Sequence, residues 1–260
     1  MSKVLVTESY LSDIADAIRT KSGGGGTTYK PSEMAQGILD ITSGGWSSDG
    51  LAMNTEPNGE ITLSTATQIK TRAFSHKSGI TRVHAPHVTS IAQFAFSNAL
   101  SGRIESTDFP SFHGGDGSFE EALITYANIP TWTNRPIYAF RNCKQLVELH
   151  LPNATGNIDR TCLGCTKLVV ADCGKGNITN GASFQSCVAL RTLILRNTDN
   201  VQTLIAWNAN CMGGIYNNPT ASTIYVPSTL ISSYQTATNW ASAYNAGVTF
   251  TAIEGSQYEL

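Results

Sequence analysis

One stretch of this chain shows the pattern that decides its fold: Ile137-Tyr138-Ala139-Phe140-Arg141-Asn142-Cys143-Lys144-Gln145-Leu146-Val147-Glu148-Leu149-His150-Leu151-Pro152. Apolar and polar residues alternate over 147–151, which predicts a strand with one buried face. The spacing Ala-Phe-x-x-Cys-x-x-Leu before that strand predicts a turn or a short helical segment that packs Phe140 inward. Both halves of the unit recur along the chain, so a repeated structure is expected.

The strand half, apolar–x–x–apolar–x–apolar, occurs in seven copies, with Thr once in place of an apolar residue and proline after five copies. The first positions of the copies are separated by 24, 20, 22, 22, 22 and 31 residues. A period near 22 residues lies in the range of leucine-rich repeats and predicts a solenoid, whose function is expected on a repeated surface. The copies are Ile80–Val83–Ala85, Ile104–Thr107–Phe109, Ile124–Ala127–Ile129, Leu146–Leu149–Leu151, Leu168–Ala171–Cys173, Leu190–Leu193–Leu195 and Ala221–Ile224–Val226.

Composition limits the classes of function. The 260 residues suffice for one elongated repeat domain with small ends, and 17 Lys and Arg against 19 Asp and Glu give a net charge of −2. We therefore expect no nucleic acid among the partners, since no basic excess would attract it. The sequence shows no apolar run of about 20 residues, so we expect no membrane insertion. The apolar run at the start is too short for a signal peptide, which predicts synthesis in the cytoplasm.

The six cysteines follow the repeat. Cys143, Cys165 and Cys187 lie 22 residues apart, and Cys162 takes a position that Phe holds in other copies. These are predicted core positions, where a free thiol behaves as a small apolar group. The Cys162-Leu163-Gly164-Cys165 spacing also suits a metal or redox site, but the sequence has no second Cys-x-x-Cys, so core packing is preferred.

Four segments are predicted. Residues 1–45 form a helical attachment or oligomerisation module, with assembly residues Leu11, Ile14, Ile18, Met34 and Ile38 on the apolar faces of two short helices; a local hairpin that caps the repeats is the alternative. Residues 46–67 form a linker and an N-terminal cap hairpin, residues 68–222 the repeats, and residues 223–260 the last strand and a C-terminal cap. In that cap, Ser228 is a candidate helix N-cap, and the alternating pattern predicts a closing strand over residues 248–253.

The unit Ala-Phe-x-x-Cys-x-x-Leu-x-x-Leu-x-Leu-Pro resembles the BspA-type leucine-rich repeat over about residues 68–227. The fold class that follows is a β-rich leucine-rich-repeat solenoid (α+β) with short N-terminal helices and a C-terminal helix–strand cap. The stretches 10–19 and 29–35 resemble the start of tail and baseplate-associated proteins of phages. Together the two resemblances imply a virion protein with an N-terminal attachment module and outward-facing repeats.

No catalytic residue is assignable, because no Gly-x-Ser-x-Gly, carboxylate pair or His-assisted nucleophile is recognisable. We expect a protein that is not an enzyme, without cofactor or metal. A metal site at His76, His84 and His87 is conceivable, but solvated histidines are the preferred interpretation.

Two side chains per repeat are predicted to project from the outer face of the strands, where repeat proteins often bind. Tyr, Asn, Asp and His in this set suit carbohydrate or a protein partner, and a merely solvated sheet face is the alternative. Ser106 and Asp108 are predicted to occupy the outward positions of the second copy. The candidate ligand-binding residues are Arg82, His84, Tyr126, Asn128, Glu148, His150, Asp172 and Tyr225.

The predicted function is a structural protein of a phage tail or baseplate, with the receptor-binding component as the specific candidate. Its expected partners are other virion proteins and a host-surface glycan or protein. We also expect a homo-oligomer, with a trimer as the specific candidate. The alternatives are a bacterial BspA-like surface adhesin and a protein-binding scaffold.

Overall fold

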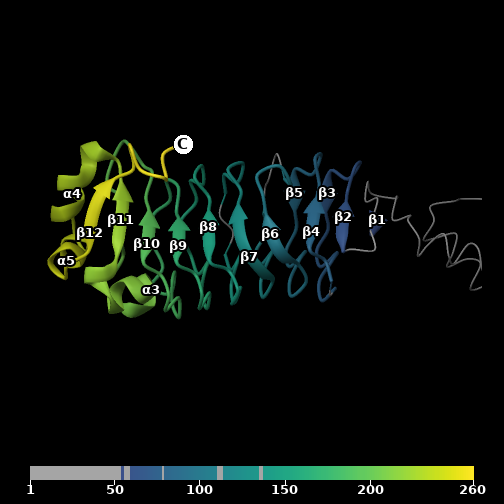
Figure 1. The fold of residues 1–260 in the computed structure, drawn as a ribbon, viewed down its shortest axis with the longest axis horizontal. Helices are drawn as coiled ribbons and strands as arrows, with labels where there is room; N and C mark the ends of the chain where they lie inside the picture. The colour runs from purple at the N-terminus through teal and green to yellow at the C-terminus, as the bar shows by residue number, and fades with distance from the viewer. Residues whose placement is uncertain (1–53, 56–58, 78, 110–113, 135–136) are drawn as a thin grey trace, which may run out of the picture.

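The computed structural model describes residues 54–55, 59–77, 79–109, 114–134 and 137–260. Its main feature is a seven-stranded sheet in the order β12-β11-β10-β9-β8-β7-β6, in which every neighbouring pair is parallel. Figure 1 shows these strands side by side along the long axis of the molecule. Their bounds are β6 Ser101–Ile104, β7 Leu123–Asn128, β8 Glu148–His150, β9 Val170–Asp172, β10 Thr192–Ile194, β11 Thr223–Val226 and β12 Thr249–Ala252.

Shorter strands precede this sheet. β1 (Asn54–Thr55) pairs antiparallel with β2 (Glu60–Thr62), across the position where the sequence predicts a hairpin. β2 pairs in parallel with β4 (Arg82–His84), and β3 (Gln68–Ile69) pairs in parallel with β5 (Ser90–Ile91). The predicted N-terminal helices, residues 1–45, lie outside the described residues.

The strand register follows the repeat period. Leu149 of β8 pairs with Ala171 of β9, and Ala171 pairs with Leu193 of β10, each 22 residues further along. Isolated bridges between Ile158 and Ile178, and between Ile178 and Leu204, form a second, shorter ladder elsewhere in each repeat. A β-rich repeat fold is therefore confirmed, and the strand predicted within 147–151 is β8.

The predicted register is wrong in the second copy. Ile104 was expected to align with Ile124, but it pairs with Ala127, after a register shift between Gly102 and Arg103. The repeat regains its phase at Phe109, because Ala85 donates its N–H to Asp108 just as Ile129 donates to His150. Residues 105–107 are thus an insertion, and Arg103, rather than Ser106, lies beside Tyr126 on the outer face. The sequence pattern was misleading here because apolar Phe109 follows the insertion, so the segment 104–109 resembles a shifted copy.

A stack of phenylalanine rings fills the core of the N-terminal repeats. The ring centroids of Phe74 and Phe96 lie 5.0 Å apart, those of Phe96 and Phe119 5.4 Å, and those of Phe119 and Phe140 5.4 Å. The rings are within 9° of parallel in each pair, and all four are buried. Each ring is covered by its equivalents in neighbouring repeats, so burial depends on the stacking.

The Ala-Phe segments lie in turns, which is one of the two alternatives that the sequence left open. Each turn contains two left-handed residues four positions apart, such as Tyr138 and Asn142 with φ of 60° and 58°. A left-handed residue other than glycine costs roughly 1–2 kcal/mol. Hydrogen bonds between repeats offset this cost: Phe119 donates its N–H to Ala139 O at 2.9 Å, and Phe140 donates to Thr161 O at 2.9 Å.

The cysteines at the repeat positions are buried and free, which confirms their predicted core placement. The Cys143 thiol donates to Phe119 O at 2.9 Å, and the Cys165 thiol donates to Phe140 O at 3.0 Å. Burial raises the pKa of both thiols well above the usual range. Since the thiolate is the reactive form, these cysteines serve packing.

Helices close the C-terminal end of the stack (Figure 1), and aromatic side chains pack together there. Trp240 donates its indole N–H to Gln202 O at 2.6 Å and packs edge-on against Tyr234 and Phe250. The predicted N-cap at Ser228 is wrong, because Ser228 starts a 3-10 turn that leads into α4 without a side-chain cap. The bounds are α3 Ala209–Asn217, η1 Pro219–Ala221, η2 Ser228–Leu230, α4 Ile231–Thr236 and α5 Trp240–Asn245.

We expect Phe119→Ala to lower the free energy of unfolding by about 3–5 kcal/mol, because it leaves a cavity between two stacked rings. The matched control is Leu123→Ala, which truncates a side chain that is 53% exposed and should change stability by about 0.5 kcal/mol or less. Urea unfolding followed by circular dichroism measures both. Equal losses in the two variants would show that the ring stack does not hold the repeats together.

Candidate functional site

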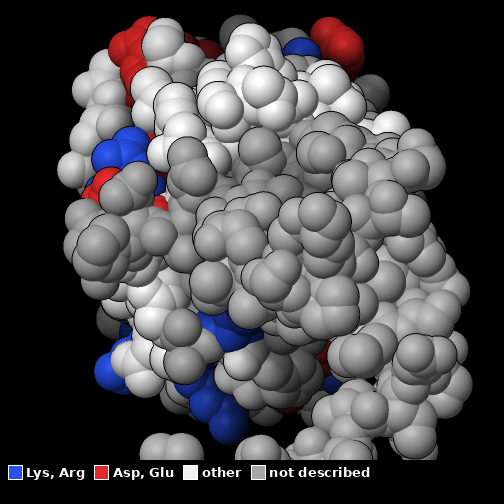
Figure 2. All heavy atoms as spheres, turned by 90° about the vertical axis from the view of Figure 1, so that its right-hand side faces the viewer, with Lys and Arg blue, Asp and Glu red and all other residues white. Residues whose placement is uncertain are grey.

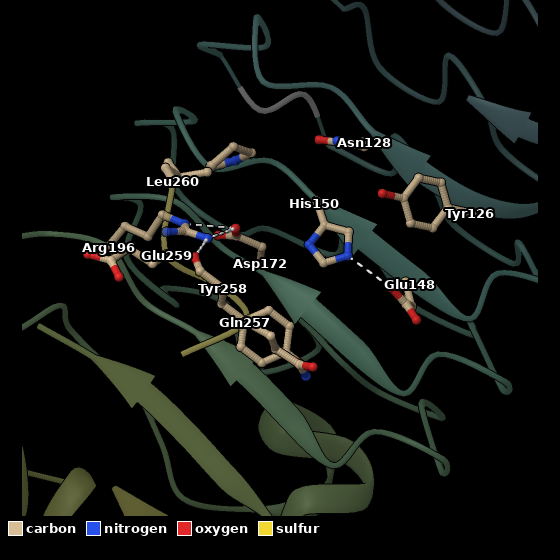
Figure 3. Close-up of a pocket in the computed structure, with 11 residues that line it drawn as sticks. Tyr126, Asn128, Glu148, His150, Asp172, Arg196, Gln257, Tyr258, Glu259 and Leu260 are labelled. Carbon is tan, nitrogen blue, oxygen red and sulfur yellow. Dashed lines mark hydrogen bonds and ion pairs between the residues drawn. The ribbon is translucent and has the colours of Figure 1, made fainter. Parts of the chain in front are cut away.

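The outer face of the sheet carries an open hollow of about 360 Å³ beside β7 and β8. Five of the predicted ligand-binding residues line it: the buried Asp172 from β9, and four less buried residues, Tyr126 and Asn128 from β7 and Glu148 and His150 from β8. Residues 257–260 form the opposite wall (Figure 3). These four side chains lie together because parallel pairing in register sets Tyr126 beside Glu148 and Asn128 beside His150.

A row of planar groups crosses the strands at this hollow. The Arg103 guanidinium lies over the Tyr126 ring, 3.8 Å from its centroid, and the Tyr126 and His150 rings lie 5.6 Å apart. The Tyr258 ring lies 6.5 Å beyond His150. Partial burial, followed by the charge of Glu105, raises the pKa of Tyr126, so its phenol stays neutral and able to donate a hydrogen bond at physiological pH.

A carboxylate and an imidazole on β8 form the polar part of the hollow. Glu148 Oε2 and His150 Nε2 lie 3.1 Å apart, and the Glu148 side chain remains more exposed than that of His150. Figure 3 shows Asn128 on the neighbouring strand and an open space between these groups and the C-terminal tail, residues 255–260. The arrangement offers hydrogen-bond donors and acceptors next to aromatic surface, which suits the binding of a polar ligand.

Asp172 was predicted as an outward ligand-binding residue, and the structure corrects this: it is 2% exposed. Its carboxylate accepts from Arg196 Nε at 2.8 Å and from the Gly174 N–H at 3.0 Å. Arg196 also donates to Tyr258 O at 2.8 Å. The Asp172 carboxylate is therefore buried and already hydrogen-bonded. Through Arg196 it positions the C-terminal tail rather than a ligand.

Tyr225 is the second correction, because it lies beneath the tail instead of facing solvent freely. Its ring meets that of Tyr258 edge-to-face, with centroids 4.7 Å apart. Val170 of β9 and Ile194 of β10 are buried in the same cluster with Ile253. The C-terminal segment therefore covers the outer face over β9–β11 and leaves it open over β7 and β8.

Arg82 and His84 on β4 lie apart from this hollow, next to a separate surface depression shared with β2. Arg82 donates from Nε to Asp108 Oδ1 at 2.9 Å, and Asp108, predicted as an outward residue, is buried. The eight candidates thus divide among three places, and only the four on β7 and β8 form one accessible group.

Arg103, Arg196 and Tyr258 are among the residues of the site that the sequence did not predict. Arg103 was not predicted because the insertion at 105–107 shifts the pattern, and Tyr258 reaches the hollow only because the chain folds back after β12. The position of Arg196 could have indicated it from the sequence: it comes directly after the strand motif Leu190–Leu193–Leu195, 24 residues after Asp172. The predicted assembly residues, Leu11, Ile14, Ile18, Met34 and Ile38, lie outside the described residues.

The described part of the chain contains no group of three or more His, Cys, Asp or Glu placed to hold a metal ion, and no helix there is long and apolar enough to cross a membrane. Figure 2 views the N-terminal end of the stack. On the described part of that face, basic and acidic side chains both occur near the margin, and neither sign forms a continuous patch.

Arg196→Ala should lower the free energy of unfolding by about 3–5 kcal/mol, because it leaves the Asp172 carboxylate buried without its charged partner. The exposed pair Arg103–Glu105 supplies the control, and Arg103→Ala should cost about 1 kcal/mol or less. Chemical unfolding at neutral pH compares the two arginines. Similar small losses would mean that Asp172 gains enough compensation from water and the Gly174 N–H.

Comparison with known proteins adds the family. Residues 53–130 and 113–234 match, in six copies, the model of the BspA type leucine rich repeat region. No curated protein matches the chain significantly. The matched stretches cover well over half of the 260 residues and include the strands that carry the hollow. The chain therefore belongs to the BspA-type leucine-rich-repeat family.

Proposed function

We propose that this protein is a non-catalytic binding protein of the BspA-like class, a surface adhesin or protein-binding scaffold, which holds its ligand on the outer sheet face over β7 and β8. The observation that carries the proposal is the row formed by Arg103, Tyr126 and His150 at the edge of an open hollow. Repeat proteins bind through such repeated faces, and the repeats are proposed to form one continuous solenoid that presents this face.

The chemistry of the hollow favours a polar ligand without strong negative charge. Aromatic surface lies next to the Asn128 amide and the Glu148 carboxylate, and Glu259 is on the opposite wall. A neutral glycan and an uncharged polar protein surface both meet this description, as Tyr, His and Asn provide stacking area and hydrogen bonds to either. A strongly anionic ligand would meet two carboxylates.

Tyr126→Ala and His150→Ala should each weaken binding at least about tenfold, because each removes one planar group from the row. Tyr244→Ala is the matched control: it truncates an exposed tyrosine on α5 that is not part of the hollow, and binding should stay within about twofold. A glycan array and immobilised bacterial and host surface proteins provide the ligands, and biolayer interferometry provides the affinities.

The readout also separates the two ligand classes. Binding confined to glycans supports an adhesin that recognises carbohydrate, and binding confined to proteins supports the scaffold or a protein-directed adhesin. If all three variants bind every ligand with the affinity of the wild-type chain, the face over β7 and β8 is not the binding site.

A phage tail or baseplate role is the second candidate. It rests on the resemblance of 10–19 and 29–35 to phage proteins, a stretch outside the described residues, and no comparison supports it. The corresponding partners, other virion proteins and a host-surface receptor, and a location in the virion are part of this candidate alone. The BspA-type family match favours the adhesin or scaffold.

The assembly role of the N-terminal segment has its own test. If Leu11, Ile14, Ile18, Met34 and Ile38 hold an oligomer together, the full chain should be a trimer in solution and a chain that begins at residue 46 a monomer. Light scattering coupled to size-exclusion chromatography gives both masses. A monomer in both cases would remove self-assembly through this segment.

A further inference from the structure

The C-terminal tail (residues 255–260) folds back across the outer face of the sheet. The chain leaves β12 at the end of the stack, and the C-terminus lies close to the end of β9 (Figure 1). Gly255 allows the reversal, with φ of 75° and open space where a side chain would begin. This return path places residues from the end of the chain over strands that precede them by some 30 to 90 positions.

The surface beneath the tail is unlike a solvated sheet face. Val170 of β9 and Ile194 of β10 point away from the main core, and they are buried only with Ile253, Tyr225 and Tyr258. The outer face of a sheet exposed to water normally carries polar residues. The apolar side chains at these positions form a binding surface, and the tail shows what kind of segment fits it.

The tail binds this surface through one aromatic side chain and one backbone acceptor. The Tyr258 ring packs on the apolar cluster and edge-on against Tyr225, and burial raises the pKa of its phenol. The Tyr258 carbonyl accepts from Arg196 at 2.8 Å, and Arg196 is itself fixed by Asp172 (Figure 3). A peptide carrying tyrosine would make the same two contacts from another chain.

The tail satisfies much of its own backbone internally, so it can leave as a unit. Gly255 donates its N–H to Glu259 Oε2 at 2.8 Å, and Glu259 donates to Ser256 O at 3.2 Å. The Tyr258 N–H is bonded to Ser256 Oγ at 3.1 Å. Release of the tail therefore breaks few backbone hydrogen bonds to the sheet, and segments with few such bonds open at low free-energy cost.

We infer that the outer face of β9–β11 is a docking surface for a tyrosine-bearing peptide segment of a partner protein, and that the C-terminal tail is its resident occupant, which the partner's segment displaces. Strand-face and groove recognition of short peptides commonly combines a pocket for one side chain with bonds to the peptide backbone. This docking surface uses strands other than β7 and β8, but it shares Arg196 and the tail with the hollow described above. The inference does not rest on the ligand proposed for that hollow, although displacement of the tail would remove one wall of it.

The test uses the full chain, wild type and Tyr258→Ala, and a labelled hexapeptide with the sequence of residues 255–260. In the wild type the attached tail competes at high effective concentration. We expect Tyr258→Ala to bind the hexapeptide at least about tenfold more tightly than the wild type does, as measured by fluorescence anisotropy. A control hexapeptide with alanine in place of tyrosine should bind neither chain.

Equal affinities of the two chains, or equal binding of the two peptides, would overturn the inference. Hydrogen exchange of the wild-type chain gives a second test that does not depend on the variant. The amides of 255–260 should be protected but should exchange faster than those of β10. Exchange of both segments at one rate would show that the tail opens only with global unfolding, and unprotected tail amides would show that it does not dock; either result contradicts displacement.

Discussion

The structure depends on the stacking of equivalent residues from one repeat to the next. A single repeat cannot bury its own apolar side chains, because each repeat contributes only short strands or bridges and turns. The rings of Phe96 and Phe119 are buried by each other, and the parallel ladder from β6 to β12 satisfies the strand backbone in the same direction. The ring stack and the hydrogen-bond ladder therefore form together, and a repeat without neighbours would have neither.

The same requirement shapes the ends and the turns. At the C-terminal end, Trp240, Tyr234 and Phe250 cover the last repeat, since no further repeat follows to do so. In the turns, left-handed residues such as Tyr138 and Asn142 are maintained because they direct backbone N–H groups at the next repeat. Local strain is thus offset by bonds that exist only in the stack.

On the outer face of the sheet too, apolar side chains are buried by another part of the chain. Over β9–β11 it carries apolar residues that the C-terminal tail covers, whereas over β7 and β8 it carries Tyr126, Glu148 and His150 and stays open. One sheet face therefore has two chemistries, and the boundary between them is set by how far the tail reaches. A polar ligand suits the open part, and an aromatic peptide suits the covered part.

The sequence by itself determined the repeat, the strands and the burial of the cysteines, because these follow from local periodicity, and every copy that keeps the 22-residue spacing was placed correctly. It also placed Tyr126, Asn128, Glu148 and His150 on one face, since side chains alternate along a strand. Only the tertiary structure decided the register across 105–107, the burial of Asp172 by Arg196, and the cover that Tyr258 gives to Tyr225. These features join residues separated by an insertion or by a chain reversal, and no periodic pattern records such contacts.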